Sequence, residues 1–260
     1  MRPQTLKNQK KKYKALILDV DGTLILNKRD GMPSKRVTEA INKASKLIHI
    51  GVATSRPYFI LSHIVDHLKL SGPSIIVGGA QIIDTASKKI LFEQPLLKKD
   101  LLKIVKLLRT SHVPLTVLDN GKDIVVSQSY KPKNPLQLWL PGLTPQEADM
   151  YINKLSHIPT IDVQKLPSWI RNKIDIVISH ASATKQHAIL EVSKVLNIQT
   201  QDIIGVGDGY NDFPLLMACG LKAAMGNAVE ELKAIADYIA PSVEEDGVAH
   251  VINKFILYKN

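Results

Sequence analysis

The chain has almost no cysteine and no long apolar run. Its one cysteine, Cys219, excludes an intrachain disulfide and suits a reducing compartment. No stretch approaches the ~18 consecutive apolar residues of a transmembrane helix, and no signal-peptide pattern follows the basic N-terminus. We therefore expect a soluble, cytoplasmic protein without a membrane partner.

The first 14 residues have no acidic side chain, although they hold six lysine and arginine residues. The whole chain has a formal net charge of +10, so more than half of that charge lies in this short segment. A lysine-rich leader without apolar periodicity predicts a disordered basic tail over residues 1–13. Because the rest of the chain is only mildly basic, its charge argues against nucleic acid as a partner, and contact of the tail with polyanions is the alternative.

An apolar run at residues 15–18 precedes the first pair of acidic residues. With no charge before Asp19, this run predicts a buried parallel strand. Ligand crevices of open α/β sheets lie beyond the carboxyl ends of the strands, so Asp19 and Asp21 are expected where a substrate can reach them. Gly22 allows the backbone to turn sharply there. An ordinary Asp/Gly turn would produce the same local sequence, so the later motifs decide between the two readings.

Apolar strands alternate with amphipathic helices in two separate parts of the chain. Ser34 and Thr184 are predicted helix N-caps, and Pro57 suits the first turn of another helix. Each of these helices lies between short apolar runs, which is the arrangement of βα units in a parallel sheet. We therefore predict an α/β fold with a doubly wound, mostly parallel, Rossmann-like sheet over residues 14–83 and 181–260. The expected strands in these parts are residues 15–18, 48–53, 74–77, 203–206, 221–225 and 238–240.

A different pattern separates these two parts. Residues 84–180 hold two predicted helices, at 98–109 and 145–156, among clustered strands. The turn-rich connection at residues 119–122 favours antiparallel pairing of the strands beside it. This segment is predicted to be an inserted α+β domain, in which the proline-rich residues 131–145 receive no definite structure. The expected strands within it and at its start are residues 82–83, 90–92, 115–118, 124–126, 160–165 and 174–178.

Four polar features stand at predicted strand ends and helix starts. They are DVDGT at residues 19–23, Thr54, Lys185, and GDGYND at residues 207–212. Together, and in this order, they resemble the motifs of the haloacid dehalogenase (HAD) superfamily. The inserted domain, the GGA at residues 78–80, and the GNA and EDGVA sequences near the C-terminus are similar to its Cof-type subfamily. The resemblance implies a HAD core domain at residues 14–83 and 181–260 and a cap domain at residues 84–180.

The resemblance implies hydrolysis of a phosphate monoester by covalent catalysis. Asp19 would attack phosphorus and become an aspartyl phosphate, and Asp21 would protonate the leaving oxygen and then activate water. Thr54 and Lys185 would hold the phosphoryl oxygens and offset their charge, which completes the predicted catalytic set. The predicted substrate contacts are Thr54, Ser55, Arg56, Lys185 and Asn211.

The resemblance also implies Mg²⁺ as the cofactor. Its predicted ligands are Asp19, the backbone carbonyl of Asp21, and Asp208, with Asp212 farther from the ion. A cation would offset the repulsion among four carboxylates at one rim of a sheet, and no Cys/His cluster favours a softer metal.

The size of the inserted domain indicates which class of substrate to expect. A cap of this size favours a small phosphorylated metabolite, with sugar or polyol phosphates as the expected class. Trp169 and Arg171 are candidates for contacting such a substrate. The alternative is that Trp169 is packed in the interior and Arg171 is solvated. The chain has Ser55 where the subfamily commonly has glycine, and Gly78 where it commonly has asparagine, which affects substrate identity more than chemistry.

Other functions share some of these features. A sugar phosphomutase would use the same nucleophile and return the phosphoryl group to a sugar. P-type ATPases have a similar GDGxND motif, but the chain lacks membrane spans and has Val20 where those enzymes have lysine. A nucleic-acid-binding protein could use the basic tail, but it has no need of four carboxylates at strand ends. A metal-dependent phosphatase is the favoured interpretation, and both a monomer and a homodimer are compatible with it.

Overall fold

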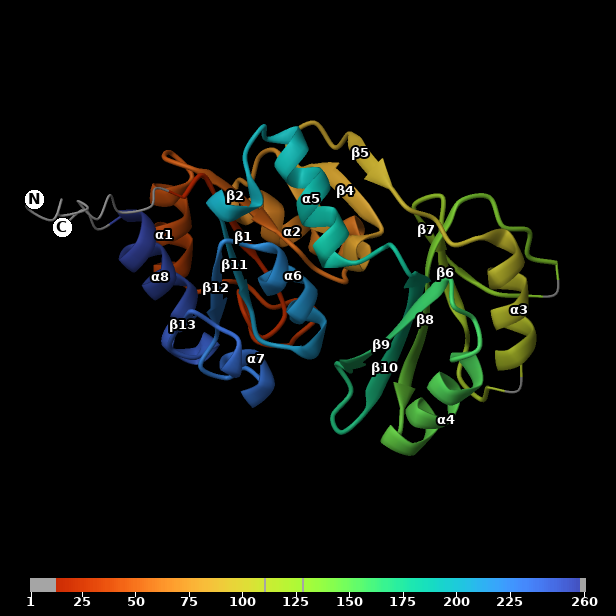
Figure 1. Cartoon of the computed structure of the whole chain (residues 1–260). Coiled ribbons are helices and arrows are strands. Elements are labelled where there is room, and N and C mark those ends of the chain that lie inside the picture. Colours follow the sequence, from red (N-terminus) through yellow and green to blue (C-terminus); the bar gives the residue numbers. More distant parts are fainter. Residues whose placement is uncertain (1–12, 110, 128, 258–260) are drawn as a thin grey trace, which may run out of the picture.

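The computed structural model describes residues 13–109, 111–127 and 129–257. The predicted disordered tail, residues 1–13, lies outside these residues except for its last position. Figure 1 shows two lobes between which the chain passes twice, after β5 and after β10. We call residues 13–93 and 181–257 the core lobe and residues 94–180 the second lobe. None of the helices within the described ranges is long and apolar enough to cross a membrane.

A five-stranded sheet of parallel strands lies at the centre of the core lobe, in the order β13-β12-β11-β1-β2. β1 lies between β2 and β11, so the strands that follow it in the chain are added first on one side of it and later on the other. This makes the carboxyl end of β1 the switch point of the sheet, where ligands of such folds bind. The strands are β1 (Ala15–Leu18), β2 (His49–Val52), β11 (Ile203–Gly207), β12 (Leu221–Ala224) and β13 (Tyr238–Ile239).

Helices cover both faces of this sheet, because side chains of each strand alternate between two cores. Leu16 and Leu18 of β1 pack with α1, α2 and α8, whereas Ala15 and Ile17 pack with α5, α6 and α7. The predicted doubly wound α/β fold is therefore confirmed. The helices are α1 (Lys35–Ala44), α2 (Tyr58–Leu68), α5 (Lys185–Val195), α6 (Phe213–Ala218), α7 (Glu230–Ala234) and α8 (Gly247–Ile252).

A three-stranded antiparallel sheet extends the edge of the core lobe. It consists of β3 (Pro73–Ile76), β4 (Gln81–Asp84) and β5 (Ile90–Glu93). A parallel bridge between Ala53 and Ile75 joins β3 to the end of β2. The expected hairpin is present, but it pairs with β3. Residues 84–93, which the sequence pattern assigned to the inserted domain, thus continue a sheet of the core lobe.

The second lobe is an antiparallel sheet in the order β7-β6-β8-β10-β9, with two helices on its outer face. Leucine and isoleucine side chains from one face of the sheet pack against these helices. The opposite face is turned toward the core lobe. The elements are α3 (Lys98–Leu108), β6 (Thr116–Asp119), β7 (Lys122–Val125), β8 (Pro135–Leu143), α4 (Pro145–Leu155), β9 (Ile161–Pro167) and β10 (Ile174–His180).

The central strand of that sheet, β8, occupies the proline-rich segment that received no assignment from the sequence. Pro135 begins the strand, and Pro141 lies near its end, where the pairing with β10 shifts register. Prolines at these places interrupt few ladder hydrogen bonds. Leu138 and Leu140 are buried under the helices, whereas Leu136 belongs to the hydrophobic cluster of the core lobe.

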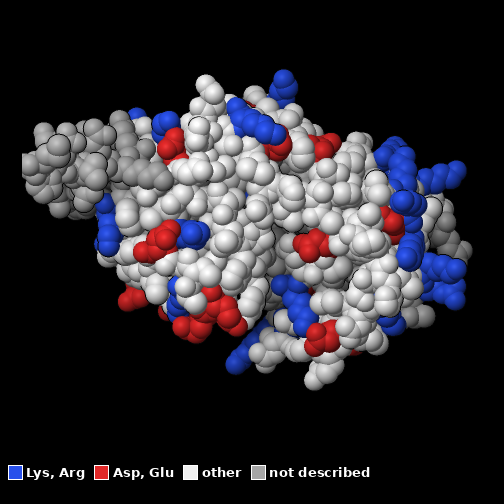
Figure 2. Space-filling model, viewed as in Figure 1, with Lys and Arg blue, Asp and Glu red and all other residues white. Residues whose placement is uncertain are grey.

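Basic side chains gather at one end of the molecule. Figure 2 shows lysine and arginine side chains along the edge of the second lobe where α3 lies. Residues 98–109, which form that helix and its C-cap, include five exposed basic residues. This charge lies away from the strand ends of the core lobe.

Candidate active site

Asp19 stands immediately beyond β1, at the switch point of the parallel sheet. Its backbone nitrogen donates to Val206 O at 2.9 Å, which extends the β1–β11 ladder by one residue. Asp19 as a whole residue is only 5% exposed. The chain turns at Gly22, whose φ of +82° suits glycine, and a Cβ at this position would lie 2.2 Å from Asp208 Oδ2. Glycine therefore lets the β1 loop approach Asp208 closely.

Asp208 and Asp212 come from the loop that follows β11. Asp212 Oδ2 accepts hydrogen bonds from the backbone nitrogens of Asp208 at 2.9 Å and Gly209 at 3.0 Å, which folds the loop back on itself. The Thr23 hydroxyl donates to Asp208 Oδ1 at 2.7 Å. These contacts fix both carboxylates beside the end of β1.

Lys185 is the cation of the cluster. It is the first residue of α5, whose N-cap Thr184 accepts from His187 N as predicted. Its ammonium donates to Asp19 Oδ1 and to Asp212 Oδ1, both at 2.6 Å, and the side chain is 2% exposed. A buried ammonium between two carboxylates is held in place by both charge and hydrogen bonding.

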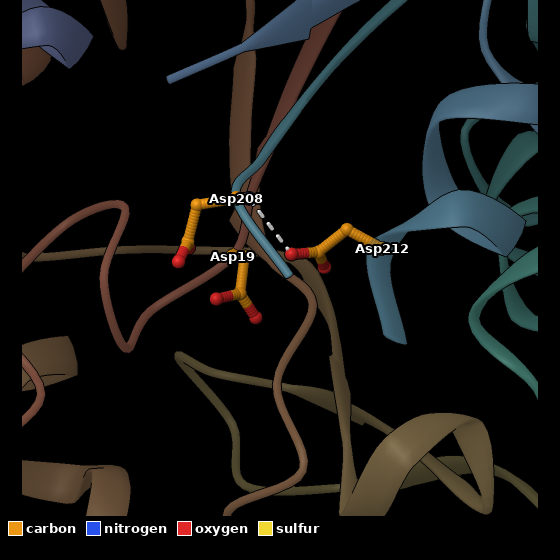
Figure 3. Close-up of side chains that lie close together, drawn as sticks. All are labelled: Asp19, Asp208 and Asp212. Carbon is orange, nitrogen blue, oxygen red and sulfur yellow. Dashed lines mark hydrogen bonds between the residues drawn. The ribbon is translucent and has the colours of Figure 1, made fainter. Parts of the chain in front are cut away.

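One carboxylate oxygen from each of Asp19, Asp208 and Asp212 lies within 4.8 Å of the other two. Figure 3 shows these three side chains gathered beside the strand ends. Burial, together with the charge of Asp212, raises the pKa of Asp19 well above its usual range, although Lys185 opposes this shift. Burial and Asp212 also raise the pKa of Asp208 to about 7. Burial lowers the pKa of Lys185, but Asp19 and Asp212 outweigh it, so that pKa is raised. One ammonium thus faces three carboxylates.

This donor set fits a hard divalent cation. The three carboxylates offer only oxygen atoms, which Mg²⁺ prefers, and a bound cation would lower the raised pKa values of Asp19 and Asp208. The predicted ligands Asp19 and Asp208 are therefore close enough to share an ion. The third nearby carboxylate belongs to Asp212, while the side chain of Asp21 is directed elsewhere.

Asp21 is bound by Arg56. The guanidinium donates from Nε to Asp21 Oδ2 at 2.8 Å and from Nη2 to Asp21 Oδ1 at 2.6 Å. It also donates to the backbone oxygens of Lys28 and Arg29, both at 2.7 Å. Arg56 was predicted to contact the substrate. In the structure its side chain is 3% exposed, and its donors hold Asp21 and the loop after β1.

A cavity of about 540 Å³ lies between the two lobes and is lined by the predicted site. Such a volume suits a small-molecule ligand. Thr54 Oγ1 accepts from Arg56 N at 3.1 Å, and the Ser55 hydroxyl has no hydrogen-bond partner among the residues that the structure describes. The predicted residues that line the cavity are Asp19, Asp21, Thr54, Ser55, Arg56, Asn211 and Asp208. Lys185 lies behind Asp19 and Asp212.

Apart from Trp169, sequence reasoning missed the cavity residues of the second lobe. Gln137 and Trp139 of β8 face the core lobe, beside Asp175 and Val177 of β10. The Trp139 indole donates to Asp175 Oδ2 at 3.0 Å. The alternation of apolar and polar residues in β8 was the only signal, and it was hidden among prolines.

Of the two candidate substrate contacts in the second lobe, Trp169 lines the cavity and Arg171 is exposed outside it. The Arg56 guanidinium lies over the Trp169 ring, 5.2 Å from its centroid. Trp169 therefore contacts the arginine that holds Asp21.

Comparisons with known proteins agree with this geometry. A family model of haloacid dehalogenase-like hydrolases matches residues 16–155 and 142–252. The chain is 27% identical to the 5-amino-6-(5-phospho-D-ribitylamino)uracil phosphatase YcsE of Bacillus subtilis, covering 94% of this chain and 96% of that protein. It is 25% identical to phosphatase YwpJ of the same organism, over 94% of this chain and all of that one. A solved haloacid dehalogenase-like hydrolase from B. subtilis superposes with a TM-score of 0.81 at 20% identity, covering 93% and 99% of the two chains.

Proposed function

The chain belongs to the haloacid dehalogenase-like hydrolase family and is a phosphatase, and we propose that it hydrolyses a small phosphorylated metabolite with the help of Mg²⁺. The observation that carries the proposal is the position of Asp19. It lies at the switch point of the sheet, bound to Lys185, close to Asp208 and facing a cavity of about 540 Å³.

In the proposed reaction Asp19 attacks phosphorus and displaces the alcohol. One oxygen of Asp19 is bound to Lys185, which leaves the other available for the attack. The ammonium favours the ionised carboxylate that a nucleophile requires and offsets charge on the phosphoryl group. When bound, Mg²⁺ would supply further positive charge to Asp19, Asp208 and the phosphoryl oxygens.

Asp21 is the proposed proton donor and acceptor. It would protonate the leaving oxygen as the P–O bond breaks, and would then take a proton from the water that cleaves the aspartyl phosphate. Its side chain is 28% exposed, lines the cavity and is held by two hydrogen bonds from Arg56. We assign Arg56 a positioning role, because its guanidinium fixes the direction of the carboxylate that must reach the leaving oxygen.

The second lobe is the proposed cap, with its sheet beginning after β5. Its inner face closes the cavity over Asp19 and Asp21, which supports a small substrate. Sugar or polyol phosphates are the proposed class, and the relative YcsE is named for a substrate that carries a phosphorylated ribityl chain. A reducing, cytoplasmic location is supported by the single cysteine, whose thiol pKa is raised by burial.

The test is phosphate release from a panel of phosphorylated sugars, polyols, nucleotides and cofactors. We expect release by the wild-type protein with Mg²⁺, and none with excess chelator or in the Asp19→Asn variant. The matched control is Asp149→Asn, an exposed carboxylate on the second lobe, which should keep wild-type activity. Conversion of a sugar phosphate to its isomer without phosphate release, stimulated by a sugar bisphosphate, would identify a phosphomutase and overturn the proposal.

A further inference from the structure

Two buried polar atoms have no hydrogen-bond partner among the described residues, and they come from different lobes. They are the Ser55 hydroxyl oxygen and the Gln137 amide nitrogen Nε2. Ser55 follows β2 in the core lobe, and Gln137 is on β8, with its side chain in the second-lobe face of the cavity. Buried polar groups are nearly always paired in folded proteins, so two unpartnered groups lining one cavity indicate a ligand that pairs with them.

Both atoms lie beside Gly78. A Cβ at residue 78 would stand 3.7 Å from Gln137 Nε2 and 3.9 Å from Ser55 Oγ. Gly78 has a φ of +66°, and it follows Val77, which has a φ of +53°. The turn thus places a residue without a side chain next to both polar atoms. A substrate oxygen near this point could reach both of them.

Asp175 of β10, which lines the same cavity as Gln137, is already paired within the second lobe. Asp175 accepts from the Trp139 indole at 3.0 Å and from Gly142 N at 2.9 Å. The neighbours of Gln137 on β6 and β10 are Leu118 and Ser179. Gln137 is 7% exposed and its amide nitrogen is buried, so solvent does not compensate its free amide hydrogens.

We propose that Ser55 and Gln137 form a specificity site that binds a hydroxyl or carbonyl oxygen on the leaving group of the substrate. The Gln137 amide donates to this oxygen, and the Ser55 hydroxyl accepts from a substrate hydroxyl or donates to a carbonyl. Because each lobe supplies one partner, the substrate bridges the lobes. This inference rests on the proposed phosphatase function and narrows its substrates to esters whose alcohol carries a second oxygen.

The experiment compares hydroxylated esters with phenyl phosphate, which has no second oxygen on its leaving group. The hydroxylated probes are glycerol 3-phosphate, erythrose 4-phosphate, ribitol 5-phosphate and glucose 6-phosphate. In the wild-type protein at least one of them should have a higher kcat/KM than phenyl phosphate. Ser55→Ala and Gln137→Leu should each lower that value about tenfold or more, and change kcat/KM for phenyl phosphate less than about threefold. The double variant should lose much less than the product of the two single losses, because both groups bind one oxygen.

Stability supplies a second measurement. Without substrate, each variant removes an unpartnered buried group, so its Tm should equal or exceed that of the wild type. The matched control is Gln164→Leu on β9, whose amide already donates to Asp162 at 2.6 Å, and which should keep the substrate preference.

Three outcomes would overturn the site. They are the absence of any wild-type preference for the hydroxylated esters, an equal loss for both kinds of ester, and a lower Tm with the preference intact. Failure of the phosphatase function itself would look different, because then no ester would release phosphate. In that case calorimetric binding of the same esters to wild-type and variant proteins would decide about the site, and equal affinities would overturn it.

Discussion

Replacing Lys185 by methionine removes the only cation that contacts Asp19 and Asp212 among the described residues. Methionine has a similar length and no charge, so packing changes little. The ammonium makes two contacts of 2.6 Å, to carboxylates whose side chains are 7% and 0% exposed. The substitution therefore leaves two buried carboxylates without their counter-charge.

The expected loss is large because buried charges without partners are costly. Breaking a buried ion pair from one side typically costs about 3–5 kcal/mol. At roughly 2–4 °C per kcal/mol for a chain of this size, Tm should fall by about 6 °C or more. The decrease in Tm caused by Lys185→Met should be smaller at pH 5 than at pH 8. The pKa of Asp19 is already raised by burial and by Asp212, and without Lys185 the carboxyl binds a proton more readily as pH falls.

The assay is thermal unfolding in excess chelator at both pH values. The matched control is Lys194→Met on the same helix, because Lys194 pairs with Glu191 at the surface and is 70% exposed. Such pairs contribute about 0.5 kcal/mol or less, so the control should shift Tm by about 2 °C at most. If Lys185→Met behaved like this control, the reasoning about the buried cluster would be refuted.

Three further predictions concern the loops around the site. The pKa of Asp208 is about 7 in the folded protein and 3.8 in the unfolded chain, so the folded state binds the proton more tightly. In chelator the free energy of unfolding should therefore fall by up to about 4 kcal/mol as pH rises from about 4 to 7. Asp208→Asn should flatten the pH dependence of Tm measured by thermal unfolding. An unchanged pH profile in this variant would contradict the prediction. Gly22→Ala should lower Tm and Mg²⁺ affinity more than Gly121→Ala, since both have positive φ but only Gly22 abuts Asp208. Arg56→Lys should lower kcat about tenfold or more with little change in KM, because lysine cannot hold both oxygens of Asp21; a rise in KM alone would indicate a substrate contact instead.

The site around Asp19 was predictable because its parts follow simple rules. Apolar runs that end in acidic residues predict parallel strands whose carboxyl ends meet at one edge, and this brought Asp19 and Asp208 together. Thr184 marked the start of α5, and so placed Lys185 at the same edge. Each of these signals is local in sequence, and the parallel topology supplies the long-range contact.

The second lobe was less predictable because its strands depend on distant partners. β8 contains Pro135 and Pro141, which local propensity treats as breaks, and its pairing with β6 and β10 overrides that preference. Without β8, Gln137 could not be assigned to the cavity. Likewise, the hydrogen bonds from Arg56 to Asp21 join residues 35 positions apart, and only the folded chain reveals them.

The central claim is that Asp19 carries the phosphoryl group during turnover. The most direct measurement is rapid acid quenching of the wild-type protein during hydrolysis of its best ester, followed by mass spectrometry of the peptide that contains Asp19. We expect one phosphoryl group on Asp19, lost on treatment with hydroxylamine and absent from the Asp19→Asn variant, which should release no phosphate. Steady phosphate release without any phosphorylated Asp19, or release by Asp19→Asn at the wild-type rate, would contradict the account.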